Sequence, residues 1–107
     1  MDDRFELLVD RSFIGFVWKH KSEDVTELMR KSQEFAHIAT FTFEYVLPNL
    51  AWILPLLREL HKPENREKRA ILRDTAFGRE IDLQNYEADD VVKILREWEP
   101  TQKEDEG

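Results

Sequence analysis

The feature that most constrains this chain is an apolar block from Phe35 to Leu60. The block is long enough to raise the question of a membrane-spanning helix, which needs about 20 apolar residues. Glu44 places a formal charge inside it, however, and Pro48, Asn49 and Pro55 interrupt it. The flanking segments show no one-sided excess of Lys and Arg. The block therefore favours buried segments in the core of a globular domain, and no contact with a membrane is expected.

The composition is consistent with one such domain. The chain has 107 residues, of which 41% are hydrophobic, including seven Phe and three Trp. That length suits one ordinary domain, and the apolar side chains suffice for one core. We expect a single globular domain over residues 1–99. An acidic, mobile tail is expected over residues 100–107, because Pro100 ends the last helical pattern.

The charge balance and the lack of cysteine exclude several classes of protein. The net charge is −7, from 23 acids and 16 bases, which argues against non-specific binding of nucleic acid. No cysteine is present, so disulfides, thiolate metal sites and Cys nucleophiles are excluded. The acidic start Met1–Arg4 leads into no apolar signal segment, so we expect a cytoplasmic protein. This size, acidity and aromatic content are common among small accessory proteins of bacteriophages, viruses and plasmids.

Two short apolar runs near the N-terminus predict strands. Phe5–Val9 and Phe13–His20 are rich in aromatic and β-branched residues, and their apolar positions scatter around a helical wheel. Read with a period of two, the second run separates its side chains onto two faces. The short polar link Asp10–Ser12 favours a β-hairpin between the runs. A buried helix over the second run is the competing interpretation.

The clearest periodicity begins after Ser22 and predicts a long helix. Ser22 is a good N-cap, and Glu23 and Asp24 follow in the first turn, where acids suit the helix dipole. The apolar stripe then recurs with helical spacing over Val25–Leu47. Proline disfavours a helical conformation in the residue before it, so the helix should end before Pro48.

Three more segments have helical periodicity and are predicted to be helices: residues 49–61, 64–77 and 87–98. The first contains Pro55, which would kink or restart it. The second begins after Pro63 and closes at Gly78. Arg79–Leu83 alternates polar and apolar residues and could form a short strand beside the hairpin. The predicted fold class is thus α+β and predominantly helical, with three to four helices and an N-terminal β-hairpin, and an all-α bundle is the alternative.

Three ionisable side chains in or beside the apolar block form a candidate buried polar site: Glu34, His37 and Glu44. An unpaired charge among apolar neighbours would be costly, and the simpler interpretation is that Glu44 points outward or pairs with Arg. Glu34 and His37 have the Glu-x-x-His spacing of di-metal helical bundles, but those bundles carry two copies of it. No metal or cofactor is therefore assigned. A helical ligand- or metal-binding protein that uses this site is the first alternative function.

Four basic residues recur at steps of four, three and four and would form one stripe on the helix over 64–77: Lys62, Arg66, Arg69 and Arg73. Such a stripe could bind phosphate, RNA or an acidic protein surface. A solvated helix face explains the pattern as well, and the acidic net charge disfavours nucleic acid. Nucleic-acid binding through this stripe is the second alternative function.

No catalytic or nucleotide-binding motif is present, so an enzyme is disfavoured. The chain has no Gly-rich phosphate loop, no Gly-x-Ser-x-Gly elbow and no His-Glu-x-x-His pair. Four aromatic side chains are candidate interface anchors: Trp18, Trp52, Tyr86 and Trp98. Together with the basic stripe they predict a small non-enzymatic protein-interaction module, such as an adaptor, inhibitor, assembly chaperone or regulatory subunit. The expected partner is another protein, or a second copy of the chain in a homodimer.

Overall fold

The computed structural model of the chain describes residues 4–28 and 37–98, and within them the chain forms five strands and three α-helices. The strands are β1 (Phe5–Asp10), β2 (Thr26–Leu28), β3 (Ile38–Phe43), β4 (Ala70–Asp74) and β5 (Arg79–Asp82). The helices are α1 (Ile14–His20), α2 (Leu50–Leu60) and α3 (Ala88–Trp98). A sheet therefore organises the fold. The prediction of a predominantly helical protein is wrong, and so is its all-α alternative.

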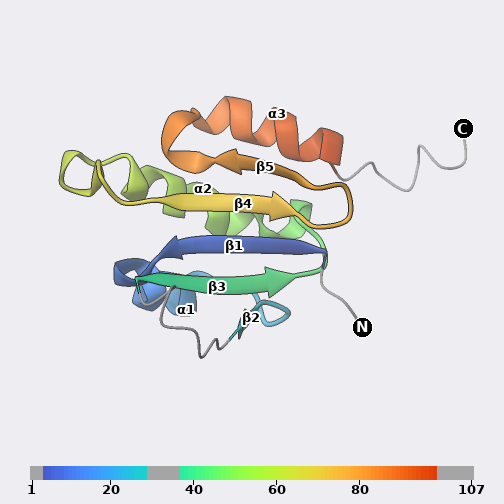
Figure 1. Cartoon of the computed structure of the whole chain (residues 1–107), viewed down its shortest axis with the longest axis horizontal. Helices are drawn as coiled ribbons and strands as arrows, with labels where there is room; N and C mark the ends of the chain where they lie inside the picture. Colours follow the sequence, from blue (N-terminus) through green and yellow to red (C-terminus); the bar gives the residue numbers. More distant parts are fainter. Residues whose placement is uncertain (1–3, 29–36, 99–107) are drawn as a thin grey trace, which may run out of the picture.

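Neighbouring strands of the sheet are all antiparallel, in the order β2-β3-β1-β4-β5. Because β1 lies between β3 and β4, strands that are far apart in the sequence pair at the centre. Figure 1 shows α1 and α2 behind this sheet, while α3 lies beside β5. The part from β1 through α1, β2, β3 and α2 to β4 has the connectivity of ferredoxin-like folds, and β5 and α3 extend it.

The face of the sheet toward α1 and α2, here called the inner face, carries the core. Alternate residues of three strands are buried on it: Phe5, Leu7 and Val9 of β1, Phe41 and Phe43 of β3, and Leu72 of β4. The helices bury their apolar stripes against these side chains: Trp52, Ile53, Leu56, Leu57 and Leu60 of α2, and Val91, Leu95 and Trp98 of α3. Each large apolar side chain buried in this way contributes about 1.5 to 3 kcal/mol, so this face supplies most of the stability.

The N-terminal segment is a strand followed by a helix, so the predicted hairpin is wrong. Its first strand is confirmed as β1. Asp10 accepts hydrogen bonds from the Ser12 backbone N–H at 2.9 Å and the Ser12 hydroxyl at 2.7 Å. This cap starts a 3-10 turn, Arg11–Phe13, which continues into α1. Phe13 and Val17 are buried four residues apart, but Trp18, Lys19 and His20 are exposed. The competing interpretation is therefore right that this run is a helix and wrong that the helix is buried.

The long helix predicted after Ser22 is also wrong, because β2 and β3 occupy much of its span. A turn follows Ser22, and residues 29–36 of the predicted helix lie outside the described residues. In β3, Phe41 and Phe43 face inward opposite β1, whereas Thr42 lies on the other face. Over so short a stretch, an alternating pattern also contains residues at helical spacing. Pairing with β1, together with β-branched Ile and Thr, decides the outcome.

The C-terminal half departs from expectation in one segment. The helix α2, the strand β5 and the helix α3 are confirmed close to their predicted bounds, and α2 continues through Pro55. The helix over residues 64–77 is wrong, because β4 occupies part of it and pairs with both β1 and β5. Gly78 has a φ of 70° and lies in the short β4–β5 connection, where a residue without a Cβ avoids strain.

Within the described residues, the apolar block forms β3, a 3-10 turn (Leu47–Asn49) and α2. No helix in this part of the chain combines the length and the hydropathy that crossing a membrane requires. The tail predicted over residues 100–107 lies outside the described residues.

Candidate functional site

Trp52 is a core residue and does not reach the surface. Its side chain is 1% exposed, and its ring meets that of Phe43 edge-on at a centroid distance of 5.9 Å. The indole N–H donates to Oδ1 of the buried Asn49 at 2.6 Å. Nδ2 of Asn49 in turn donates to the Tyr45 carbonyl at 2.6 Å. Because these polar atoms are satisfied inside the protein, Trp52 stabilises the fold and presents nothing to a partner.

Trp98 is likewise buried, at the C-terminal end of α3. The guanidinium of Arg79 lies over its ring, 5.2 Å from the centroid. The Trp98 carbonyl accepts a hydrogen bond from Nη2 of Arg4 at 2.7 Å. Two of the predicted aromatic anchors thus pack within the fold, because the apolar stripes that contain them are the faces that α2 and α3 turn toward the sheet.

Asp74 is a fully buried carboxylate on the inner face, held by two guanidiniums. Arg4 donates from Nε at 3.1 Å and from Nη2 at 3.2 Å, Arg79 donates from Nε at 3.2 Å, and the Ala76 N–H donates at 3.1 Å. Burial opposes ionisation of Asp74, but the hydrogen bonds from Arg4 and Arg79 outweigh it and lower its pKa below the ordinary value. Since donors of the chain itself occupy its oxygens, we interpret Asp74 as the centre of a structural ion-pair cluster.

The four predicted basic residues do not form one stripe, because no helix spans them. Lys62 and Arg66 flank a 3-10 turn, η4 (Pro63–Asn65), whereas Arg69 precedes β4 and Arg73 lies within it. Three of the four make ion pairs: Lys62 with Glu59 at 2.9 Å, Arg69 with Asp82 at 3.3 Å, and Arg73 with Glu6 at 3.4 Å and Glu80 at 3.5 Å. The basic surface on which the nucleic-acid alternative depends is therefore divided and largely neutralised.

The candidate buried polar site is not assembled in the described part of the chain. His37 and Glu44 are both exposed and lie at opposite ends of β3. Seven residue steps of extended chain separate their Cα atoms by roughly 23 Å, so the two side chains cannot share a ligand. Glu34 lies outside the described residues. Among the residues described, no group of three or more His, Asp or Glu side chains is arranged to hold a metal ion.

The face of the sheet away from α1 and α2, here called the outer face, carries a row of three apolar residues and one threonine. Four residues meet side by side across four strands, and we call them the outer row: Leu28, Thr40, Leu8 and Ile71. Leu28 is 40% exposed and Leu8 and Ile71 are half-buried, whereas Thr40, between Leu28 and Leu8, is buried at 2% exposure. Figure 1 looks onto this face, and no described helix crosses in front of it.

Charged side chains border the outer row on both sides. On one side Glu6, Arg73 and Glu80 are neighbours across three strands and form a ladder of two ion pairs. On the other side lie Asp10 and Arg69, and Arg69 pairs with Asp82, the β5 residue opposite Ile71 at the end of the row. Four carboxylates thus face two guanidiniums, which leaves a net charge of −2 among these six side chains.

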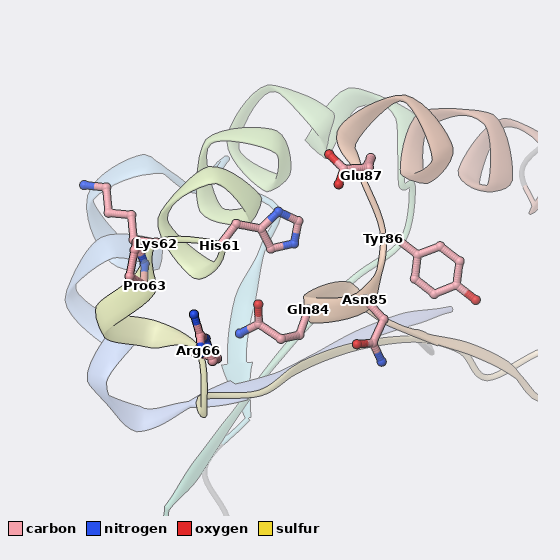
Figure 2. A pocket seen from close by; sticks show the side chains of 8 residues that line it. All are labelled: His61, Lys62, Pro63, Arg66, Gln84, Asn85, Tyr86 and Glu87. Atoms are coloured by element: carbon pink, nitrogen blue, oxygen red, sulfur yellow. The ribbon is translucent and has the colours of Figure 1, made fainter.

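Tyr86, the third predicted aromatic anchor, lines a hollow of about 370 Å³ at the end of α2. Figure 2 shows the amide of Gln84 between His61 and Arg66, with the Tyr86 ring turned away from them. Side chains that bind backbone carbonyls hold the walls together: His61 Nε2 to Leu83 at 3.0 Å, Gln84 Nε2 to Asn65 at 3.0 Å and Lys68 at 2.8 Å, and Asn65 Nδ2 to Glu59 at 2.7 Å. The sequence offers no sign of this hollow, because its walls come from connections that only the fold brings together.

Exposed aromatic side chains lie mostly at positions that the sequence did not single out. Phe77 is 68% exposed, Tyr45 54% and Trp18 53%. Phe77 is bracketed by Arg4 and Arg79, whose guanidinium carbons lie 5.2 and 4.9 Å from its ring centroid. Trp18, one of the predicted anchors, donates its indole N–H to Glu27 at 2.7 Å. The short turn before Gly78 was the available signal for Phe77.

Comparison of this chain with protein-family models, curated proteins and solved structures found no match. A functional proposal therefore depends on the geometry of the outer face and of the hollow.

Proposed function

We propose that this protein is a non-enzymatic interaction module that binds a partner protein with the outer face of its sheet. The observation that carries the proposal is the outer row, which lies on a face that no described helix covers. Burying exposed apolar surface contributes about 25 cal/mol per Å², so a partner that covers this row gains stability from it. Apolar patches with polar borders commonly mark protein interfaces.

The borders of the outer row indicate the chemistry of the partner. Four carboxylates and two guanidiniums lie beside it, and both guanidiniums already bind carboxylates of the same face. A partner with an apolar centre and a basic rim complements this surface. A nucleic acid would meet a net negative charge and, on the described strands, no exposed aromatic ring for base stacking. A second copy would bring like charges together.

The proposal is tested by a charge placed in the outer row. Ile71→Glu adds a carboxylate at a half-buried position on the outer face, where water can still reach it. Ala51→Glu is the matched control, because it adds the same side chain at an exposed position of α2, behind the sheet. We expect Ile71→Glu to weaken binding of the partner captured from source-cell extract at least tenfold, and Ala51→Glu to leave it unchanged. Titration calorimetry with the purified partner measures both.

Circular dichroism and thermal melting show whether each variant remains folded. Equal binding by the two variants would contradict the proposal, as would a wild-type chain that captures no protein from the extract. Light scattering of the isolated chain tests whether the partner is a second copy, because it shows whether the chain forms a homodimer. A dimer that Ile71→Glu dissociates would make the outer face a self-association surface in place of a surface for a different partner.

A further inference from the structure

We infer that the hollow beside Arg66 is a binding site for a ligand that carries a carboxylate with an N–H group on the neighbouring carbon, as in a free amino acid or the C-terminal residue of a peptide. This site lies between η4 (Pro63–Asn65) and η5 (Leu83–Asn85), and it is independent of the outer face. Its volume of about 370 Å³ lies within the usual range of small-ligand sites.

Arg66 supplies the positive charge of the site. Its side chain is exposed and makes no ion pair or hydrogen bond within the described part of the chain, in contrast to Lys62, which pairs with Glu59 at 2.9 Å. Figure 2 shows the Lys62 amine directed away from the hollow. A planar guanidinium binds a carboxylate through two parallel hydrogen bonds, so Arg66 is available for one anionic group.

Gln84 supplies a fixed acceptor. Its Nε2 donates to the carbonyls of Asn65 and Lys68, at 3.0 and 2.8 Å, and this assigns the orientation of the amide because carbonyls can only accept. Oε1 therefore points the other way, and Figure 2 shows it on the side of the amide toward His61, while Nε2 lies on the side toward Arg66. Because two hydrogen bonds already hold the amide, a ligand that donates to Oε1 loses little free energy in ordering the Gln84 side chain.

His61 fixes one wall of the hollow. Its Nε2 lies 3.0 Å from the Leu83 carbonyl, which requires a hydrogen on Nε2. Figure 2 shows the other ring nitrogen, Nδ1, on the edge of the ring away from Gln84 and Arg66, so it does not face the same space as Oε1. The site thus combines one cationic donor with one oriented acceptor, and Glu87 adds a carboxylate to its lining.

This set of groups selects among anions. A phosphate dianion would need more positive charge than Arg66 provides and would be repelled by Glu87. A monocarboxylate satisfies Arg66, and an ammonium or amide N–H beside it satisfies Oε1 of Gln84. Free amino acids and peptide C-termini share this chemistry, and suitable probes distinguish them.

The test is an NMR titration of the ¹⁵N-labelled chain with glycine, N-acetylglycine and glycinamide. We expect glycine, N-acetylglycine or both to shift the Gln84 side-chain amide and neighbouring backbone signals, with a Kd of order 1 mM. Binding of glycine alone identifies free amino acids, and binding of N-acetylglycine identifies peptide C-termini. Glycinamide lacks the carboxylate and should cause no shift.

Arg66→Gln should weaken carboxylate binding at least tenfold, and Arg66→Lys should weaken it less, because the charge remains and the planar fork is lost. Arg58→Gln is the matched control, since Arg58 is also exposed but does not line the hollow. Thermal melting establishes that each variant is folded. The proposal is overturned if no probe shifts these signals, if glycinamide binds equally, or if Arg66→Gln binds like Arg58→Gln.

Discussion

The two faces of the sheet use apolar side chains in different ways. On the inner face, residues at alternate positions of the central strands are fully buried, and α1 and α2 cover them. On the outer face, apolar contacts are concentrated in the outer row, and ion pairs border it. The inner face therefore supplies most of the stability of the free chain, whereas the outer row adds less to it.

Both faces also contain carboxylate–guanidinium contacts, and these differ in burial. Asp74 on the inner face is fully buried between Arg4 and Arg79. Glu6 on the outer face pairs with Arg73, which is 38% exposed. Removing one member of a buried ion pair leaves charges without compensation, while exposed pairs are screened by water. The comparison predicts a large energetic difference between two chemically similar contacts.

The largest effect is expected from Asp74→Asn. The substitution keeps the shape of the side chain but removes the charge that compensates Arg4 and Arg79. We expect it to lower the free energy of unfolding by about 3 kcal/mol, measured by urea denaturation. A loss below about 1 kcal/mol would show that solvent already screens this cluster and that the two faces do not differ in this respect.

Two adjacent leucines of β1 test the difference in packing. Leu7 is fully buried on the inner face, and Leu8 is half-buried in the outer row. Leu7→Ala should cost about 3 kcal/mol of unfolding free energy, because it leaves a cavity in the core. Leu8→Ala should cost less than about 1 kcal/mol. Equal losses in urea denaturation would mean that the outer row belongs to the core, which would remove the basis of the proposed interface.

The pH dependence of stability sharpens the same comparison. The pKa of Asp74 is lower in the folded protein than its ordinary value near 3.9, so the unfolded chain binds the proton more tightly. The stability that ionised Asp74 contributes is therefore fully present above about pH 4 and is lost as pH falls through the lower, folded value. Urea denaturation at several pH values should show a smaller acid-induced loss in Asp74→Asn than in the wild type. Identical pH profiles would exclude this linkage.

The smallest effect is expected from Glu6→Gln. This substitution removes the 3.4 Å ion pair with Arg73 on the outer face, and Arg73 retains Glu80 at 3.5 Å. We expect a change in unfolding free energy below about 0.5 kcal/mol, further reduced by added salt. A loss comparable to that of Asp74→Asn would show that the border of the outer face is as important to the fold as the inner cluster.

The candidate sites could be predicted from the sequence only in part. The residue types were informative, since Arg66 and Tyr86 belong to the predicted interaction residues and line the hollow. Their grouping was wrong, because it assumed a helix over residues 64–77. Trp52 and Trp98 have the chemistry of interface anchors, but the same apolar character places them in the core. Chemistry alone does not tell which apolar side chains are buried by the chain's own sheet.

The sequence by itself determined the elements whose local signals agree: β1, α2 through Pro55, β5, and α3 with its strongly amphipathic pattern. Only the tertiary structure decided the segments whose patterns fit two periods. Phe13–His20 became a helix after the Asp10 cap, while Ile38–Phe43 and Ala70–Asp74 became strands. The physical reason is that β3 and β4 gain their hydrogen bonds and buried neighbours from β1, 28 or more residues away in the sequence. Contacts of that range leave no trace in the local pattern, and they alone create the two faces of the sheet.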